Sequence, residues 1–114
     1  ACAVLGVPVL TSERFEADLS VISANLYRDG KDSVAWHGDR VARTRAETVV
    51  AILSLGSPRH FLLRPKGGGR SVRLEPAQGD LLVLGGTCQR TWEHSVPKRA
   101  RAGPRISVMF REEY

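Results

Sequence analysis

The order of apolar and polar residues along the chain predicts a mostly β protein. In residues 20–27 apolar side chains alternate with polar ones, the period of a strand with two different faces. Residues 105–111 alternate in the same way. Residues 48–56 are almost continuously apolar and predict a strand buried on both faces, although so short a run also fits a helix, and 78–86 predict a turn followed by a buried strand. Short strands separated by glycine- and proline-containing turns favour a sandwich, barrel or jelly roll.

Other segments complete this prediction. Thr11 and Ser12 are candidate N-caps, so we expect a short N-terminal helix around residues 12–18. Residues 60–65 follow the apolar strand 48–56 after a Gly-Ser-Pro turn, and we expect them to form its hairpin partner. No repeat or domain boundary is visible, so residues 1–114 are predicted to form a single domain.

Composition narrows the class of protein. A chain of 114 residues, 42% of them hydrophobic, can bury a small core, and no apolar run is long enough to span a bilayer. The net charge of +5 attracts polyanions and is compatible with nucleic-acid contact. Two cysteines, Cys2 and Cys88, are too few for a disulfide framework and lack C-x-x-C spacing. We therefore expect a monomer in a reducing cytoplasm, away from the membrane.

His37 and Asp39 have the spacing of two metal ligands. Alternate side chains of a strand share a face, and Gly38 leaves room between them. His94 lies far enough along the chain to return to the same place as a third ligand. Two imidazoles and one carboxylate on one face of an octahedron form the facial triad of non-haem iron oxygenases, which leaves positions open for co-substrate and dioxygen. Taken alone, His-x-Asp is more often an ordinary surface pair, and that alternative stays open.

The last predicted strand carries candidate anion-binding residues. Alternation places Arg105, Ser107 and Arg111 on one face, and Ile106 with Phe110 on the other, which we expect to be core. A guanidinium binds a carboxylate through two parallel hydrogen bonds, so Arg105 could hold a dicarboxylate that chelates the metal at its other end. The alternative, favoured by this strand in isolation, is two arginines on a solvated edge strand.

Three segments together resemble the AlkB family of iron- and 2-oxoglutarate-dependent dioxygenases: NLYRDGKDSVAWHGDR, LLVLGGTCQRTWEHSVPK and GPRISVMFR. The resemblance runs in order from about Ser20 to Arg111 and implies a double-stranded β-helix, a jelly-roll variant. It also implies site residues: His37, Asp39 and His94 for Fe(II), Arg105 for the distal carboxylate of 2-oxoglutarate, and Asn25, Tyr27, Ser107 and Arg111 for the co-substrate pocket. The family commonly has Asn where this chain has Ser107.

The resemblance implies a reaction as well as a fold. With Fe(II), 2-oxoglutarate and O2, the enzyme would oxidise an N-methyl group on a nucleic-acid base and release formaldehyde, succinate and CO2. The base must be unpaired or flipped out of a duplex to reach the metal. Two alternatives remain: the same oxidation of an RNA nucleoside, protein or metabolite, and a basic β-module that binds nucleic acid without catalysis.

Two departures from the family pattern concern the substrate. Family members that repair DNA often continue His-x-Asp with acidic residues, where this chain has Arg40 and Val41. Few residues precede Asn25, so we expect the chain to lack a full N-terminal nucleotide-recognition lid. Arg40 and Lys66 are candidate substrate contacts, and we expect two basic clusters near the mouth of the site: Arg64, Lys66, Arg70 and Arg73 around a glycine loop, and Lys98, Arg99 and Arg101 after His94.

The proposed metal set makes a first prediction. Asp39→Ala removes the only carboxylate ligand, so we expect it to weaken iron binding and abolish turnover. Parallel assays of bound iron and of 2-oxoglutarate turnover check this. Retained activity with iron still bound would exclude Asp39 from the site.

Overall fold

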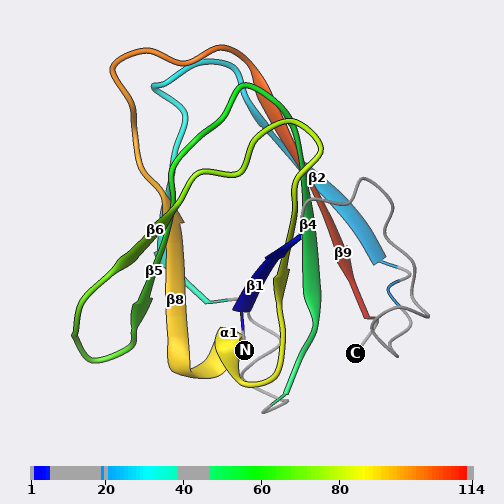
Figure 1. Cartoon of the computed structure of the whole chain (residues 1–114), viewed down its shortest axis with the longest axis vertical. Coiled ribbons are helices and arrows are strands. Elements are labelled where there is room, and N and C mark those ends of the chain that lie inside the picture. Colours follow the sequence, from blue (N-terminus) through cyan, green and yellow to red (C-terminus); the bar gives the residue numbers. More distant parts are fainter. Residues whose placement is uncertain (1, 6–18, 20, 39–46, 113–114) are drawn as a thin grey trace.

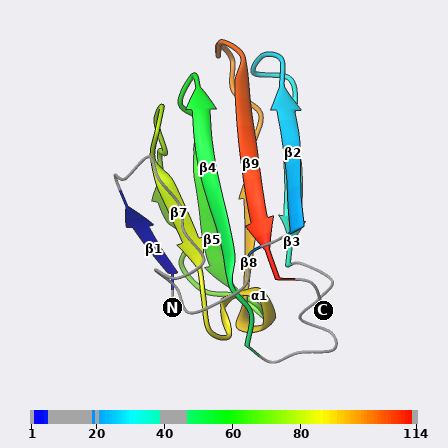
Figure 2. The ribbon, with the colours of Figure 1, turned by 90° about the vertical axis from the view of Figure 1, so that its right-hand side faces the viewer.

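The computed structural model describes residues 2–5, 19, 21–38 and 47–112, which form two antiparallel sheets facing each other (Figures 1 and 2). The five strands of the large sheet are, in spatial order, β1 (Cys2–Leu5), β7 (Leu81–Leu84), β4 (Val50–Gly56), β9 (Arg105–Arg111) and β2 (Val21–Tyr27). The small sheet contains β3 (Val34–His37), β8 (Trp92–Val96), β5 (Phe61–Pro65) and β6 (Val72–Leu74). One four-residue helix, α1 (Cys88–Thr91), is described between β7 and β8. The prediction of a mainly β fold is confirmed.

The expected hairpin between residues 48–56 and 60–65 is wrong. β4 lies in the large sheet and β5 in the small sheet, so the turn between them carries the chain from one sheet to the other. The physical reason is that β4 is a central strand, with β7 hydrogen-bonded on one side and β9 on the other. No edge of β4 remains for β5, which pairs with β6 and β8 instead.

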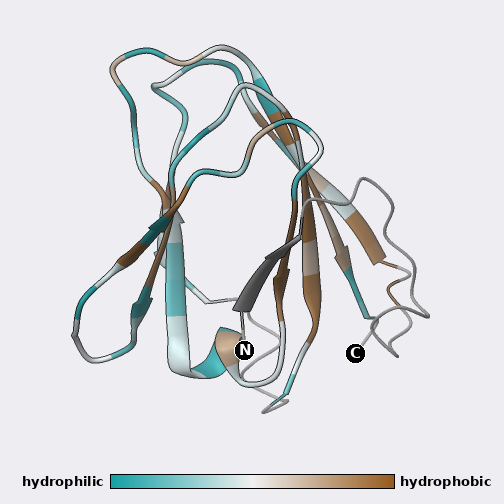
Figure 3. Ribbon diagram, viewed as in Figure 1, coloured by the Kyte–Doolittle hydropathy of each residue, from teal (hydrophilic) through white to brown (hydrophobic). Residues whose placement is uncertain are grey.

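The main core lies between the two sheets. Its buried side chains come from both layers: Val50, Ile52, Leu82 and Leu84 from the large sheet, Phe61, Leu63 and Val96 from the small sheet, together with Tyr27 and Cys88. Figure 3 shows the apolar colouring concentrated on β4 and β7, whereas β8 is largely polar. The near-continuous apolar runs therefore form central strands covered on both faces, as their pattern predicts.

The two faces of β9 differ from the expectation. Arg105 and Ser107 are buried and face the space between the sheets, whereas Ile106 on the opposite face is 40% exposed. Phe110 joins a smaller cluster with Ala51 and other residues on the outer face of the large sheet. The assignment of Ile106 to the core is thus wrong, because the inner face of β9 lines a cavity that takes the polar set.

The predicted helix at 12–18 lies outside the described residues. Within the described part of the chain, no helix has the length and apolar character needed to cross a bilayer. Cys88 is buried and disulfide-bonded, and the cytoplasmic location stays a prediction, as do the single domain and the monomer.

The layered core predicts a large difference between two leucines. Leu82 is buried between the sheets, whereas Leu26 on the outer face of β2 is 60% exposed. We expect Leu82→Ala to lower the free energy of unfolding by about 2–5 kcal/mol because it leaves a cavity. Leu26→Ala, the matched control, should change it by no more than about 0.5 kcal/mol. Urea unfolding of both variants checks this, and equal losses would contradict the assignment of the core.

Candidate active site

A cavity of about 280 Å³ lies between the sheets. Its polar lining comes from strands of both layers and from α1: Ser23, Asn25 and Tyr27 on β2, His37 on β3, Gln89 on α1, His94 on β8, and Arg105, Ser107 and Arg111 on β9. Apolar side chains such as Val50, Ile52 and Phe61 complete the wall. Seven of the residues predicted from the sequence therefore meet at one place.

His37 and His94 face each other on neighbouring strands. β3 and β8 pair antiparallel with these two residues in register, next to an irregularity between Val34 and His37. The ring centroids are 4.3 Å apart and the planes are inclined by 56°. Nδ1 of His37 lies 2.8 Å from the carbonyl oxygen of Ala35, so Nδ1 donates a proton to that carbonyl and Nε2 is the ring nitrogen available to a metal. Metal-binding histidines are commonly oriented by such a backbone carbonyl.

His94 is held in its neutral form. Its ring is buried and stacks on Phe61, with centroids 5.3 Å apart. Burial lowers the pKa of His94 to about 4, and the neighbouring His37 and Arg111 contribute to the same shift. The imidazole is therefore uncharged near neutral pH, which is the form that binds a metal ion.

Arg105 is a buried cation whose hydrogen-bonding capacity is largely unused. The residue is only 2% exposed, and Nη2 donates to Ser54 Oγ at 3.0 Å. Nε and Nη1 are buried and have no hydrogen-bond partner in the structure. β9 is a central strand between β4 and β2, so the alternative of arginines on a solvated edge is wrong. Burial also lowers the pKa of Arg105 from its usual value.

The other predicted co-substrate residues line the same cavity. Tyr27 pairs with Arg105, and Asn25 with Ser107, along the β2–β9 ladder. Arg111 lies further along β9, where Nη2 is 3.4 Å from Met109 Sδ. No acidic residue is among the described residues that line the cavity, which favours a negatively charged ligand.

The predicted substrate contacts are only partly placed. Asp39 and Arg40 lie outside the described residues, so the third metal ligand stays a prediction. Across the described ranges, no group of three metal-binding side chains is present. Lys66 is exposed, and its Nζ lies 3.5 Å from the position that a Cβ on Gly38 would take, beside His37. Its role in binding substrate also stays a prediction.

The two basic clusters do not share one end of the fold. The glycine loop follows β5 near α1, where the Lys66 amide donates to the Thr91 carbonyl. Arg99 instead lies beside the β2–β3 turn, with its amide bonded to Gly30. In Figure 1 the orange loop after β8 and the β5–β6 hairpin are at opposite ends. The expectation that both clusters lie near one mouth is wrong, because β8 carries the chain across the small sheet between them.

Gln89 is the residue that sequence reasoning missed. It is buried on α1 and lines the cavity together with both histidines. A four-residue helix is too short to show a helical pattern of apolar residues. The only sequence signal for Gln89 is its place five residues before His94.

A family comparison agrees with this geometry. The family model described as the 2OG-Fe(II) oxygenase superfamily matches residues 11–111. The chain belongs to this superfamily. Its name specifies ferrous iron and 2-oxoglutarate, as the resemblance implied.

Individual relatives lie in the AlkB family. The chain is 37% identical to alpha-ketoglutarate-dependent dioxygenase alkB homolog 3 of Mus musculus, over 79% of this chain and 35% of that protein. It is 35% identical to DNA oxidative demethylase ALKBH2 of Arabidopsis thaliana, over 90% of this chain and 39% of that protein. The chain thus spans little more than a third of these relatives. The predicted resemblance to the AlkB family is confirmed.

A solved structure supports the fold. The structure of OsALKBH1 superposes with a TM-score of 0.70 at 19% identity, covering 84% of this chain and 49% of that one. At this identity the similarity concerns the fold alone. Together with the two facing antiparallel sheets, it confirms the predicted jelly roll.

The close packing of Gly38 makes a prediction about the site. A Cβ on Gly38 would lie 2.5 Å from the backbone oxygen of Gln89, so a side chain there must push β3 and α1 apart. We expect Gly38→Ala to move His37 from His94 and to lower the affinity for a divalent metal about tenfold. A metal titration monitored by calorimetry checks this.

Gly103→Ala is the matched control. A Cβ there would first meet the Ser57 side chain at 3.4 Å, an ordinary contact. This variant should keep the metal affinity of the parent. Unchanged affinity in Gly38→Ala would show that the packing of Gly38 does not position His37.

Proposed function

We propose that this chain is the catalytic part of an Fe(II)- and 2-oxoglutarate-dependent dioxygenase that demethylates N-alkylated bases in nucleic acid. The observation that carries the proposal is the cavity between the sheets. It holds two facing imidazoles and a buried guanidinium with two unpaired nitrogen atoms.

The described residues fit the co-substrate and the metal. Buried polar atoms nearly always have partners, so the free Nε and Nη1 of Arg105 call for an acceptor from outside the protein. A carboxylate supplies two such acceptors. His37 and His94 offer imidazole nitrogens as ligands, and that of His94 is uncharged. In this proposal they hold Fe(II) together with Asp39.

The protein's own residues orient the reactants. Arg105 binds the distal carboxylate of 2-oxoglutarate, and Asn25, Tyr27, Ser107 and Arg111 surround the same ligand. Bound Fe(II), with 2-oxoglutarate and O2, would supply the oxidation that converts an N-methyl group to formaldehyde, with succinate and CO2 as co-products.

Nucleic acid is the proposed substrate. One relative is named a DNA oxidative demethylase. The net charge of +5 favours a polyanion, and Lys66 lies exposed beside Gly38 and His37. Arg40 is the second proposed contact with the phosphate backbone. We propose that the protein acts as a monomer in the cytoplasm.

A second candidate is the same oxidation of another substrate, such as an RNA nucleoside, a protein or a metabolite. The observation that favours it is the sequence after the metal motif, where Arg40 and Val41 replace the acidic residues expected of a DNA-repair member. Formaldehyde release from N-methylated oligonucleotides would distinguish the two candidates. Succinate formed without loss of the methyl group would favour the second.

Arg105 provides the sharpest test of the co-substrate assignment. We expect an anaerobic titration of Fe(II) and 2-oxoglutarate to produce the charge-transfer band of the chelate. Arg105→Lys keeps a positive charge but loses the forked geometry, so 2-oxoglutarate affinity should fall about 10- to 100-fold, as for a lost hydrogen bond to a charged group.

Arg73→Lys is the control for this substitution. Arg73 is exposed on β6 and does not line the cavity. The Arg73→Lys variant should bind 2-oxoglutarate with the affinity of the parent protein. Absence of the absorption band in the parent protein would contradict the proposed function, and equal affinity in both variants would exclude Arg105 as the carboxylate site.

A further inference from the structure

A second buried arginine, Arg59, lies next to Tyr27, a residue that lines the cavity. It lies in the segment that crosses from β4 to β5 and is only 1% exposed. Its guanidinium donates to three backbone carbonyls: Nη1 to Asp29 at 3.0 Å, and Nη2 to Asp32 at 2.8 Å and to Pro97 at 2.7 Å. Arg59 thus joins the β2–β3 turn to the loop after β8. It is not among the residues that line the cavity.

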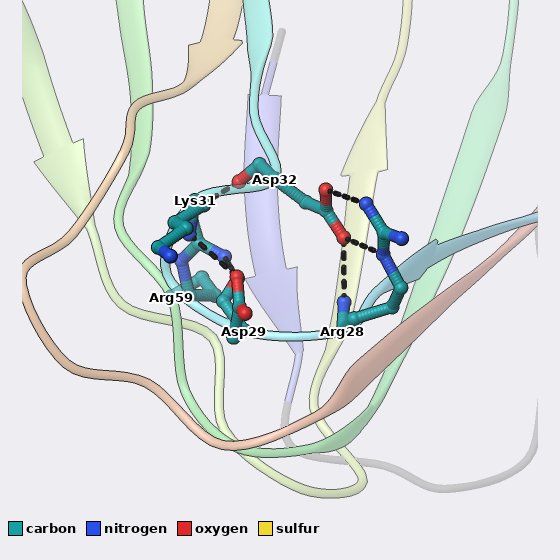
Figure 4. Close-up of polar contacts among 5 residues, drawn as sticks. All are labelled: Arg28, Asp29, Lys31, Asp32 and Arg59. Atoms are coloured by element: carbon teal, nitrogen blue, oxygen red, sulfur yellow. Dashed lines mark hydrogen bonds and ion pairs between the residues drawn. The ribbon is translucent and has the colours of Figure 1, made fainter.

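The turn that Arg59 holds is ordered by contacts of its own. Asp32 accepts hydrogen bonds from the Arg28 amide and guanidinium at 2.8–2.9 Å, and Asp29 accepts one from the Lys31 amide (Figure 4). The Arg99 amide donates to the Gly30 carbonyl at 2.8 Å. A Cβ on Gly30 would lie 1.9 Å from the Arg99 oxygen. The turn and the loop therefore pack backbone against backbone.

Tyr27 connects this assembly to the cavity. It is the last residue of β2, directly before the turn, and is buried. The guanidinium carbon of Arg59 lies 5.5 Å from the centre of its ring, and that of Arg105 lies 5.2 Å from it. Both cations are within the distance at which an aromatic ring attracts a positive charge. Tyr27 thus contacts both guanidiniums.

The two arginines differ in how they are satisfied. Arg59 gives both terminal nitrogens to three protein carbonyls and leaves only Nε without a partner, so most of its hydrogen-bonding capacity is met inside the protein. Arg105 donates to Ser54 and also interacts with the Tyr27 side chain, but its buried Nε and Nη1 make no hydrogen bond. One cation is therefore fixed by the backbone, and the other is left for a ligand.

We propose that Arg59 is a positioning residue for the co-substrate: by tying the β2–β3 turn to the loop after β8, it holds Tyr27 against Arg105 and fixes the Arg105 guanidinium for a distal carboxylate. This inference rests on the proposed function, since it assumes that Arg105 binds 2-oxoglutarate. Arg59 itself does not touch the ligand. It sets how strongly the cavity prefers a dicarboxylate to a monocarboxylate.

The test compares two 2-oxo acids that differ at the distal end. 2-Oxoglutarate carries the second carboxylate, and 2-oxobutyrate lacks it. Both affinities are measured by anaerobic calorimetry with Fe(II). The readout is the affinity for 2-oxoglutarate divided by the affinity for 2-oxobutyrate. Arg59→Lys replaces two forked nitrogens with a single one. We expect it to reduce the ratio of 2-oxoglutarate affinity to 2-oxobutyrate affinity about tenfold, because a misplaced Arg105 would lose the equivalent of one hydrogen bond to the distal carboxylate.

A second variant disturbs the same contact through the buried Gly30. Gly30→Ala pushes the turn away from Arg99 and displaces the carbonyls that Arg59 binds, without altering Arg59 or the cavity lining. It should reduce the ratio in the same direction. If Arg59→Lys does not fold, Gly30→Ala decides the question.

Arg99→Lys is the matched control. Arg99 donates from its side chain to the Pro58 carbonyl and to Glu75 on the exposed side of the same region. The affinity ratio of the Arg99→Lys variant should equal that of the parent protein. An unchanged ratio in a folded Arg59→Lys or Gly30→Ala variant, or equal loss of affinity for both acids, would overturn the proposal. Failure of the parent to bind 2-oxoglutarate would instead contradict the proposed function.

Discussion

The burial of the Arg105 charge between two sheets is the constraint on which the rest of the site depends. A guanidinium removed from water is costly unless its hydrogen bonds and its charge are met. The protein provides Ser54 and the face of Tyr27, and no described acid lines the cavity. The remaining hydrogen-bonding capacity of the guanidinium, at Nε and Nη1, is available to the cavity, so an anion is needed to satisfy it. A dicarboxylate co-substrate meets that demand and binds the metal at its other end.

Much of this arrangement could be predicted from the sequence because it follows from strand period. Alternation along 105–111 and 20–27 placed Arg105 with Ser107, and Asn25 with Tyr27, on shared faces, and the structure brings all four to one cavity. The family resemblance supplied the pairing of His37 with His94, which no local pattern contains. Asp39, the remaining ligand, lies outside the described residues and rests on the sequence alone.

The parts that could not be predicted depend on pairing between distant segments. Whether β5 joins β4 or the opposite sheet depends on which edges of β4 are already occupied, and that is decided by β7 and β9. The same reason explains Ile106: alternation defines two faces, but only the packing of both sheets decides which of them is inside. Gln89 could not be predicted because its helix has only four residues, too few to show a helical pattern of apolar positions.

The two arginines also explain why one turn matters to a site that it does not line. A ligand-binding charge must be held still before the ligand arrives, or the ordering cost reduces affinity. Among the described residues, Ser54 and Tyr27 hold the Arg105 guanidinium, because its Nε and Nη1 make no hydrogen bond, and Ser54 bonds to one nitrogen only. Rigidity must therefore come from the ring beside it, and that ring belongs to the strand end that Arg59 ties to the neighbouring loop. A rigid β2–β3 turn therefore increases the selectivity of the cavity for a dicarboxylate, because it fixes the position of Tyr27 and so of Arg105.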